Sequence, residues 1–275
     1  MKILLTGAAG ALGSVLRPAL ADLADTLVCT DVKPAPGALA DNETWMQADL
    51  AELDQAEPLC DGVDVIVHLA SIPDEAPFED LLRPNFLSAY AVWEAAHRAG
   101  VSRIVYASSV HAVGMHETNR TIDTDAPHRP DTFYGLAKCF TEDLARLYWE
   151  KRGLETVVCR IFSCSPEPQN VRALSTWLSH GDLVRLVTAA IACRTVGFTT
   201  VYGVSANTRM PVSNARAAFL GYVPRDDAED WAAELTAREG PADPSDGAQM
   251  RLGGPFATIP LGQSGVAAIK AMADG

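Results

Sequence analysis

Lys2-Ile3-Leu4-Leu5-Thr6 is an apolar run at the start of the chain, and Gly7-Ala8-Ala9-Gly10-Ala11-Leu12-Gly13 follows it directly. Residues 11–23 come next and have the pattern of a helix. Glycines between a strand and a helix allow a sharp turn and a close approach to a pyrophosphate, whose charge is stabilised at the helix N-terminus. Glycine also occurs in ordinary strand–helix connections. Because this turn opens an alternating strand–helix pattern and an acid follows at a suitable distance, we predict a dinucleotide site.

That acid is Asp31, which ends the second predicted strand, residues 26–31. An acid roughly 20 residues beyond such glycines hydrogen-bonds the adenosine ribose. Its carboxylate would repel the 2′-phosphate of NADP, and although Lys33 is near, no arginine follows immediately. We therefore predict NAD as the cofactor; the alternative is an ordinary acid at a strand end.

The composition is that of a globular protein, with 275 residues of which 48% are hydrophobic and 21% charged. The net charge of −13 argues against nucleic acid or an anionic membrane as a partner, since both bind basic surfaces. No apolar run approaches the roughly 20 residues that span a bilayer, and no signal-peptide pattern precedes the first strand. We expect a cytoplasmic protein with a small-molecule substrate, which a local cation must bind if it is an anion.

The six cysteines are scattered, without a C-x-x-C pair or a histidine at metal-ligand spacing. Several have apolar neighbours, which favours buried free thiols over disulfides or zinc ligands. We therefore expect no metal site. The cysteines are Cys29, Cys60, Cys139, Cys159, Cys164 and Cys193.

Further apolar stretches at residues 45–50, 63–70, 103–109 and 155–161 alternate with helical patterns. Such alternation predicts an α/β fold, a Rossmann-type doubly wound parallel sheet with right-handed crossovers. His68 lies inside one of these runs and is expected to be a core histidine. A long helix is predicted over residues 78–99, with Pro84 near its first turns and Gly100 as its stop.

The pattern changes after residue 161. Residues 174–193 have helical spacing, residues 199–203 suggest another strand, and residues 240–262 are rich in glycine and proline. We expect residues 1–161 to form the NAD-binding Rossmann domain. Residues 162–275 are expected to form a small substrate-binding portion packed on the same domain, over the strand ends.

Two serines, Ser108 and Ser109, stand at the carboxyl end of the strand over residues 103–109, where open α/β sheets hold ligands. Tyr134 and Lys138 are four residues apart and share one face of a helix. A phenol has a pKa of about 10, and lowering it by about 3 units requires roughly 4 kcal/mol. Lys138, with an oxidised nicotinamide, could supply that stabilisation and make Tyr134 a general base, with Ser109 holding the substrate oxygen. The alternative is an exposed Tyr/Lys pair on an amphipathic helix.

This ordered set of motifs resembles the extended branch of the short-chain dehydrogenase/reductase superfamily over roughly residues 1–165. It comprises the three glycines, Asp31, Asp49-Leu50, Asn85, Ser109 and Tyr134-x-x-x-Lys138. The resemblance implies that Ser109 is the catalytic serine, with Ser108 as the fallback. The cofactor contacts that it implies are Gly7, Gly10, Ala11, Leu12, Gly13, Asp31, Asp49, Leu50, Leu69, Ala70, Asn85, Tyr134, Lys138 and Ile161.

Residues 77–79, 109–111, 161–168, Arg172 and 174–180 are similar to the uronate dehydrogenases of this branch. The similarity implies oxidation of the anomeric carbon of D-glucuronate or D-galacturonate to an aldarolactone, with NAD as oxidant. By position, Arg172 would clamp the substrate carboxylate, a task that suits a planar guanidinium. The substrate contacts that the similarity implies are Ser71, Pro73, Ser109, Val110, His111, Tyr134, Ser163 and Arg172.

Pro73 and Val110 depart from the family, in which a polar Ser or Asn can occupy these positions. Side-chain hydrogen bonds are lost there, which bears on the preference between the two epimeric uronates. Ser163 and His111 would hydrogen-bond sugar hydroxyls.

Two other functions stay open. A nucleotide-sugar epimerase or dehydratase shares the same machinery but generally carries a larger C-terminal portion with which to hold the nucleotide. An NAD-sensing regulator is the non-catalytic alternative, and the intact Tyr134 and Lys138 count against it. The resemblance also implies a homo-oligomer, for which residues 140–149 offer an apolar surface.

Overall fold

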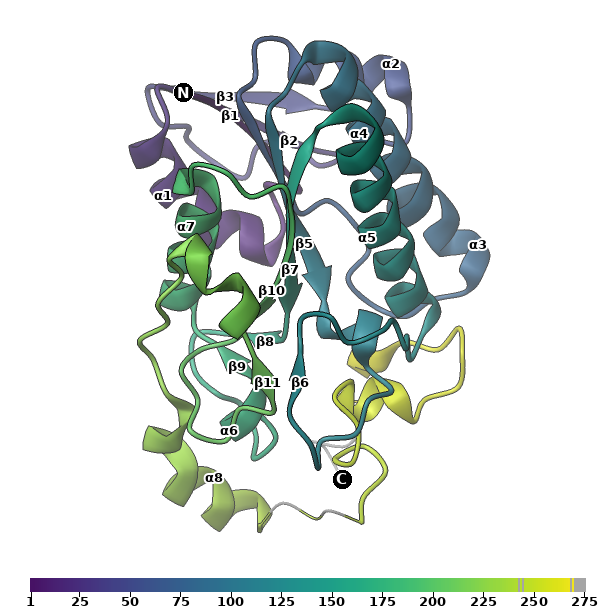
Figure 1. Cartoon of the computed structure of the whole chain (residues 1–275), viewed down its shortest axis with the longest axis vertical. Coiled ribbons are helices and arrows are strands. Elements are labelled where there is room, and N and C mark those ends of the chain that lie inside the picture. The colour runs from purple at the N-terminus through teal and green to yellow at the C-terminus, as the bar shows by residue number, and fades with distance from the viewer. Residues whose placement is uncertain (242, 244, 268, 270–275) are drawn as a thin grey trace.

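The computed structural model describes residues 1–241, 243, 245–267 and 269, and a seven-stranded parallel sheet forms its centre (Figure 1). The spatial order is β10-β7-β5-β4-β1-β2-β3, so the chain runs outward from β1 in both directions. This is the doubly wound arrangement that the sequence predicts, and its order reverses between β1 and β4. The strands are β1 (Lys2–Thr6), β2 (Thr26–Asp31), β3 (Glu43–Gln47), β4 (Val65–His68), β5 (Arg103–Ser109), β7 (Glu155–Ile161) and β10 (Phe198–Gly203).

Helices cover both faces of this sheet, with α1 and α7 on one side and α4 and α5 on the other (Figure 1). Ile3 and Leu5 of β1 pack towards the first pair and Leu4 towards the second. Because both faces are buried, the strands read as continuous apolar runs. No helix in the described part of the chain is long and apolar enough to cross a membrane. The helices are α1 (Ala11–Leu23), α2 (Leu53–Ala56), α3 (Phe78–Leu81), α4 (Ser88–Ala99), α5 (Phe133–Arg152), α6 (Ala173–Thr176), α7 (His180–Ala192) and α8 (Ala232–Glu239).

Two small parallel sheets lie beyond the carboxyl ends of the central strands (Figure 1). They pair β6 (Ile122–Asp123) with β11 (Val212–Ser213), and β8 (Ser163–Cys164) with β9 (Trp177–Leu178).

The helix predicted over residues 174–193 is wrong in its first part. The chain forms α6, becomes extended at Trp177 to pair β9 with β8, and starts α7 only at His180. Ser179 Oγ accepts a hydrogen bond from the main-chain N–H of Asp182 and so caps α7. The apolar spacing runs through this break and does not reveal it.

The helix predicted over residues 78–99 is interrupted. A π-helical turn, Leu82–Leu87, separates α3 from α4. Pro84 lies in that turn and has no N–H to donate, which accounts for the altered hydrogen bonding. Gly100 ends α4 as predicted, with φ of 73°.

The strand predicted at residues 199–203 is confirmed as β10, which pairs with β7 at the edge of the central sheet. The buried apolar side chains of α7 and α1 also belong to one hydrophobic cluster. The central sheet therefore includes a strand from the second part of the chain, beyond residue 161. The division into an NAD-binding part, 1–161, and a substrate-binding part, 162–275, remains a prediction.

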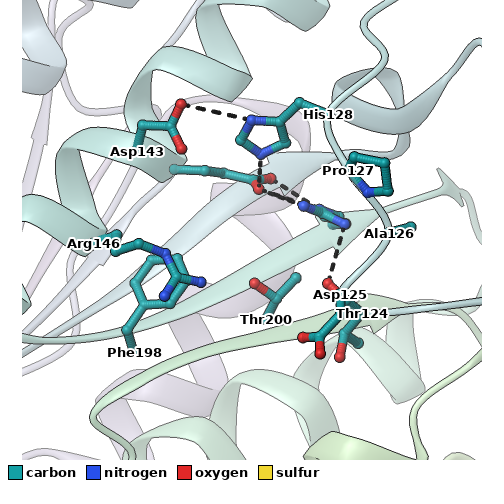
Figure 2. Close-up of a pocket in the computed structure, with 11 residues that line it drawn as sticks. Thr124, Asp125, Ala126, Pro127, His128, Asp143, Arg146, Phe198 and Thr200 are labelled. Atoms are coloured by element: carbon teal, nitrogen blue, oxygen red, sulfur yellow. Dashed lines mark hydrogen bonds and ion pairs between the residues drawn. The ribbon is translucent and has the colours of Figure 1, made fainter.

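Glu142 is the centre of a buried polar network between α5 and β7. Its carboxylate accepts hydrogen bonds from Arg160 at 2.8 Å and from His128 Nε2 at 2.9 Å, and Ser108 Oγ also donates to it. Burial opposes the ionisation of Glu142, but these contacts outweigh it and lower the pKa. An open pocket of about 590 Å³ lies beside the network, with His128 at its edge (Figure 2).

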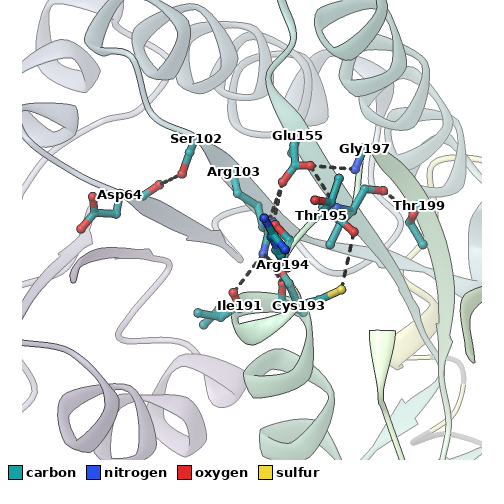
Figure 3. Close-up of polar contacts among 12 residues, drawn as sticks. Asp64, Ser102, Arg103, Glu155, Ile191, Cys193, Arg194, Thr195, Gly197 and Thr199 are labelled. Atoms are coloured by element: carbon teal, nitrogen blue, oxygen red, sulfur yellow. Dashed lines mark hydrogen bonds and ion pairs between the residues drawn. The ribbon is translucent and has the colours of Figure 1, made fainter. Parts of the chain in front are cut away.

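Arg103, at the start of β5, fixes the end of α7 to the sheet (Figure 3). Its guanidinium donates hydrogen bonds to the main-chain carbonyls of Ala190, Ile191 and Cys193. The same group forms an ion pair with Glu155 of β7. A cation at a helix C-terminus satisfies carbonyls that lack partners within the helix and interacts favourably with the helix dipole.

All six cysteines are free thiols, as predicted, but only four are buried, because Cys164 and Cys193 are partly exposed. His68 is confirmed as a core histidine. Its Nδ1 is hydrogen-bonded to Thr6 Oγ1 at 2.8 Å, and burial lowers its pKa to about 3.

Candidate active site

A cleft of about 520 Å³ lies at the carboxyl ends of β1, β2, β3 and β4. The strand order reverses here, so the cleft lies where a doubly wound sheet binds its ligand. It is lined by most of the predicted cofactor contacts and by two predicted substrate contacts. The predicted residues among its walls are Gly7, Gly10, Ala11, Leu12, Gly13, Asp31, Asp49, Leu50, Leu69, Ala70, Ser71 and Pro73.

The glycine-rich turn packs closely against its own backbone and the residues that follow β4 because it lacks side chains. Gly7 has φ of 68°, and a Cβ there would lie 2.8 Å from the main-chain nitrogen of Ala70. A Cβ on Gly13 would lie 2.4 Å from the Gly7 carbonyl oxygen. Gly10 stands at the N-cap of α1 and offers no capping side chain, so the first N–H groups of α1 face the cleft. This geometry fits a pyrophosphate.

Asp31 is held rigidly at the wall of the cleft. One carboxylate oxygen accepts the main-chain N–H of Ala9 and the other that of Lys33, both at 3.0 Å. A fixed carboxylate at the end of β2 fits the two hydroxyls of an adenosine ribose and disfavours a phosphate in their place. Asp49 also lines the cleft, but its carboxylate is paired with Arg83.

Asn85 does not line this cleft. Its amide oxygen accepts the N–H of Ile72 at 2.8 Å, and its amide nitrogen donates to the Ile72 carbonyl at 3.0 Å. Asn85 thereby holds the segment after β4 that carries Ser71 and Pro73. A direct contact between Asn85 and a cofactor stays a prediction.

Ser109, Tyr134 and Lys138 meet where β5 ends and α5 begins. Thr132 caps α5 by accepting a hydrogen bond from the N–H of Gly135. Tyr134 and Lys138 lie on one buried face of α5, and Lys138 Nζ is 5.4 Å from the centre of the Tyr134 ring. Ser109 is the last residue of β5, and its Oγ accepts the main-chain N–H of His111 at 3.3 Å. Ser109 also lies near the Tyr134 side chain, whose ionised form it favours.

Ser109 and Ser108 differ in their contacts, which distinguishes their roles. Ser108 Oγ donates to Glu142 of α5, so the structure uses Ser108 in the buried polar network around Glu142. Ile161 is the register partner of Ser109 in β7. Lys138 Nζ donates to the main-chain carbonyl of Ala107 at 2.8 Å, which places the ammonium group at the end of β5.

Burial disfavours the charged forms of both Tyr134 and Lys138. Burial raises the pKa of Tyr134 to about 12, and the nearby Ser109 hydroxyl offsets only part of that rise. Burial also lowers the pKa of Lys138 to about 7. Without the coenzyme, burial therefore outweighs any stabilisation of the phenolate, and the combined effect of Lys138 and a nicotinamide on the pKa of Tyr134 stays a prediction. A phenolate at this position requires a further positive charge.

Arg172 is a cation without an acidic partner. Its Nη1 donates to Ser163 Oγ at 3.2 Å and to Thr176 Oγ1 at 3.5 Å, and its Nη2 donates to the Leu252 carbonyl. Among the described residues, no carboxylate lies within ion-pair distance of it. Desolvation lowers the pKa of Arg172 to about 10, which leaves it charged at neutral pH. A guanidinium has five N–H groups, so Arg172 keeps donors free for an anionic ligand.

His111 and Val110 follow Ser109 in a short 3₁₀ turn, Val110–Val113. Val110 is buried, whereas His111 remains partly exposed. The Phe256 ring stacks on that of His111 with 4.2 Å between the ring centres, and Phe256 also packs with Tyr134. The predicted residues Ser109, Val110, His111 and Tyr134 are thus brought together, and Phe256 joins them from the C-terminal segment.

The sequence predicts that residues 162–275 contribute to the substrate pocket, but it names no contact after Arg172. Besides Leu252 and Phe256, the C-terminal segment contains Gly254, where φ is 63° and a Cβ would lie 2.4 Å from Arg172 Nε. Further along, the N–H of Gly262 donates to Glu75, and the other Glu75 oxygen accepts the N–H of Tyr134 at 2.8 Å. The glycines were visible in the sequence, but nothing local pointed to their contact with Arg172.

The model of the NAD dependent epimerase/dehydratase family matches residues 3–193. The uronate dehydrogenase of Pseudomonas putida is 44% identical over 93% of this chain and 97% of its own length.

Two solved structures are similar over nearly the whole chain. One is the glucuronic acid dehydrogenase from Chromohalobacter salexigens, with a TM-score of 0.91 and 42% identity over 94% of this chain and 97% of that one. The other is a variant of the uronate dehydrogenase from Agrobacterium tumefaciens complexed with NAD, with a TM-score of 0.90 and the same identity and coverage. The chain therefore belongs to the NAD dependent epimerase/dehydratase family and, within it, to the uronate dehydrogenases.

Proposed function

We propose that this protein is an NAD-dependent uronate dehydrogenase, which oxidises C1 of the cyclic forms of D-glucuronate or D-galacturonate to the aldarolactone. The observation that carries the substrate assignment is Arg172, a cation that contacts only neutral acceptors among the described residues. A buried or half-buried charge without a counterion is unfavourable, and an incoming carboxylate would supply one in bidentate geometry. The named activities of the relatives agree with this assignment.

The chain's own residues fit NAD. The free N–H groups at the start of α1 would receive the pyrophosphate, and the carboxylate of Asp31 would bind the adenosine ribose. When bound, NAD supplies a hydride acceptor and a positive nicotinamide ring.

Within the substrate, two bonds break and a second bond between C1 and its oxygen forms, while the hydride acceptor and Tyr134 each gain a bond to hydrogen. The C1–H bond breaks with its electron pair leaving as hydride, the hydroxyl O–H bond gives its proton to Tyr134, and C1 becomes a carbonyl carbon. Tyr134 must be a phenolate to accept that proton, and the ammonium form of Lys138 would favour it against the effect of burial. Ser109 lies near Tyr134 and would hold the same substrate oxygen.

We infer that the segments after residue 161 form the substrate pocket. Arg172 would bind the carboxylate of the sugar, and Ser163, which it contacts, would hydrogen-bond a sugar hydroxyl. Leu252 and Phe256 would complete the wall. Ser71, Pro73 and Val110 would line the side next to the coenzyme cleft.

The test is a substrate panel with NAD and NADP. D-glucuronate and D-galacturonate are expected to give reduced NAD, whereas D-glucose, D-galactose and UDP-glucose are not. If neutral aldoses reduce NAD as efficiently as uronates do, Arg172 does not select the substrate. Epimerisation of UDP-glucose without net coenzyme reduction would support the nucleotide-sugar alternative, and coenzyme binding without any turnover would support the sensor.

We also propose that the protein self-associates. Apolar side chains are exposed along α4, α5 and the turn before them, and α4 and α5 lie side by side (Figure 1). A Tyr90→Glu substitution should reduce the mass measured by light scattering, and Val223→Glu, elsewhere on the surface, should not. The exposed residues are Leu87, Tyr90, Leu136, Phe140 and Leu147.

A cytoplasmic location is a further proposal. It is supported by the six free thiols, since reducing compartments maintain cysteines in that state.

A further inference from the structure

Asp131 carries a completely buried carboxylate at the edge of the proposed substrate pocket. The side chain has 0% exposure, and its Oδ2 lies 2.8 Å from His111 Nδ1. Its Oδ1 accepts a hydrogen bond from Thr132 Oγ1 at 2.9 Å. Among the described residues, neither a lysine nor an arginine forms an ion pair with it. Burying a carboxylate without such a partner is unfavourable, so its position calls for a reason.

The surrounding backbone is shaped around this carboxylate. A Cβ on Gly114 would lie 1.9 Å from Asp131 Oδ2, and a Cβ on Gly253 would lie 1.7 Å from the same atom. A Cβ on Gly135 would lie 3.1 Å from Oδ1. Three separate segments therefore approach Asp131 at positions without side chains, and together they exclude water from it.

The contact with His111 determines which ring nitrogen carries the proton. A carboxylate only accepts hydrogen bonds, so Nδ1 must be the donor. When the ring is neutral, Nε2 is then left as an acceptor, and it has no partner among the described residues. Phe256 stacks on the ring at 4.2 Å and the Tyr134 ring is 5.6 Å away, so the ring orientation is fixed as well.

We propose that Asp131 is a positioning residue for sugar oxidation: it holds His111 in the Nδ1–H tautomer, so that Nε2 accepts a hydrogen bond from a sugar hydroxyl next to Tyr134. This inference rests on the proposed function. Asp131 acts through His111 and contacts no reacting atom. Its negative charge also favours the charged form of Arg172 and the protonated form of Tyr134, which couples it to both ends of the pocket.

The first test uses the native protein. Nitrogen-15 NMR of the histidine rings, with the His111 signals assigned by their loss in His111→Gln, should show the Nδ1–H tautomer at neutral pH. The Nε2–H tautomer would overturn the proposal. This measurement needs no substrate, so its outcome is independent of whether uronates are turned over.

The second test is a double-mutant cycle. Asp131→Asn should lower kcat/KM for the uronate roughly 10-fold, the scale expected when a hydrogen-bonded contact is misaligned, and should leave NAD affinity unchanged. In a His111→Gln background the same substitution should have no further effect on kcat/KM. Equal effects in both backgrounds would show that Asp131 does not act through His111.

A matched control is Asp182→Asn. Asp182, in the first turn of α7, is equally buried, but it pairs with Arg185 and accepts the main-chain N–H groups of Arg225 and Asp226. This variant should lose stability while keeping both the His111 tautomer and kcat/KM. If the panel of sugars shows no uronate activity, the kinetic arm is run with the sugar that is oxidised, and the NMR result stands by itself.

Discussion

The guanidinium of Arg172 donates a hydrogen bond to the main-chain carbonyl of Leu252, 80 residues further along the chain. The bond ties the residue proposed to bind the substrate carboxylate to the C-terminal segment. Gly254, two residues later, lies against the same guanidinium. The orientation of Arg172 therefore depends on a stretch of chain that is remote in sequence.

Arg172→Lys should raise the KM for uronates roughly 10- to 100-fold while changing kcat much less. An ammonium group cannot make two parallel hydrogen bonds to a carboxylate, and one lost charge-assisted bond corresponds to about 1.5–3 kcal/mol. Steady-state kinetics at saturating NAD measures this. The control is Arg216→Lys, at an exposed ion pair with Asp123, which should behave as wild type. An unchanged KM in Arg172→Lys would exclude Arg172 from substrate binding.

Gly254→Ala tests the contact from the opposite side. Its Cβ would lie 2.4 Å from Arg172 Nε, so the guanidinium must move, and we expect KM to rise at least several-fold. The φ of 63° also strains any L side chain, which costs roughly 1 kcal/mol of unfolding free energy.

Gly221→Ala separates these two effects. Gly221 has φ of 75°, but a Cβ there has no neighbour within 4 Å. It should lose similar stability in urea denaturation without a change in KM. Equal KM changes in the two glycine variants would mean that strain, and not displacement of Arg172, is responsible.

Tyr134→Phe should retain NAD binding and lose turnover by at least about 100-fold, since general acid–base groups typically contribute that much. The ring and its packing against Phe256 are preserved, so only the proton acceptor is removed. NAD affinity from tryptophan fluorescence and initial rates with D-glucuronate are the two measurements. Tyr148→Phe is the control, because Tyr148 lies near the other end of α5 and donates its hydroxyl to Glu94 of α4. Normal turnover in Tyr134→Phe would contradict the assignment of the base.

The sheet, the glycine turn and Asp31 could be predicted because each depends on neighbours in sequence. Apolar runs identify buried parallel strands. Gly7 must be a glycine because a tight strand–helix turn at a dinucleotide site requires one. The pairing of Tyr134 with Lys138 follows from helical spacing alone.

The contacts of Asp131, Leu252 and Glu75 could not be predicted in this way. Each joins segments that meet only in the folded chain, and no periodicity records which carbonyl or amide a side chain will reach. The raised pKa of Tyr134 in the chain alone could not be predicted either, because desolvation depends on the surrounding packing. The break before α7 was missed because a strand pairing outweighed the helical pattern.

Arg103→Met should destabilise the fold by about 3 kcal/mol, since it leaves Glu155 and the carbonyls at the end of α7 without their donor. Thermal and urea unfolding measure the loss, and KM for the substrate should not change in the folded fraction. Arg146→Met is a suitable control, because Arg146 is an exposed member of an ion pair with Glu150. Equal stability of Arg103→Met and wild type would show that this cluster does not hold α7 to the sheet.

The ion pair between Arg17 of α1 and Glu43 of β3 should make stability depend on pH in a defined window. Burial opposes ionisation of Glu43, but hydrogen bonds from Arg17, Cys29 and the N–H of Ala40 outweigh it and lower the pKa from 4.5 to about 2. A carboxylate with a lowered pKa in the folded state stabilises the protein fully above its unfolded pKa. That contribution, about 3 kcal/mol here, is lost as the pH falls from about 4.5 towards about 2.

Glu43→Gln should therefore be less stable than wild type at neutral pH, and the difference in unfolding free energy should shrink as the pH is lowered through that window. Urea denaturation at several pH values between about 7 and 3 gives the comparison. Glu150→Gln, at an exposed ion pair, should match wild type throughout, because surface pairs contribute little. A difference between Glu43→Gln and wild type that is independent of pH would mean that Glu43 acts through its shape and not through its charge.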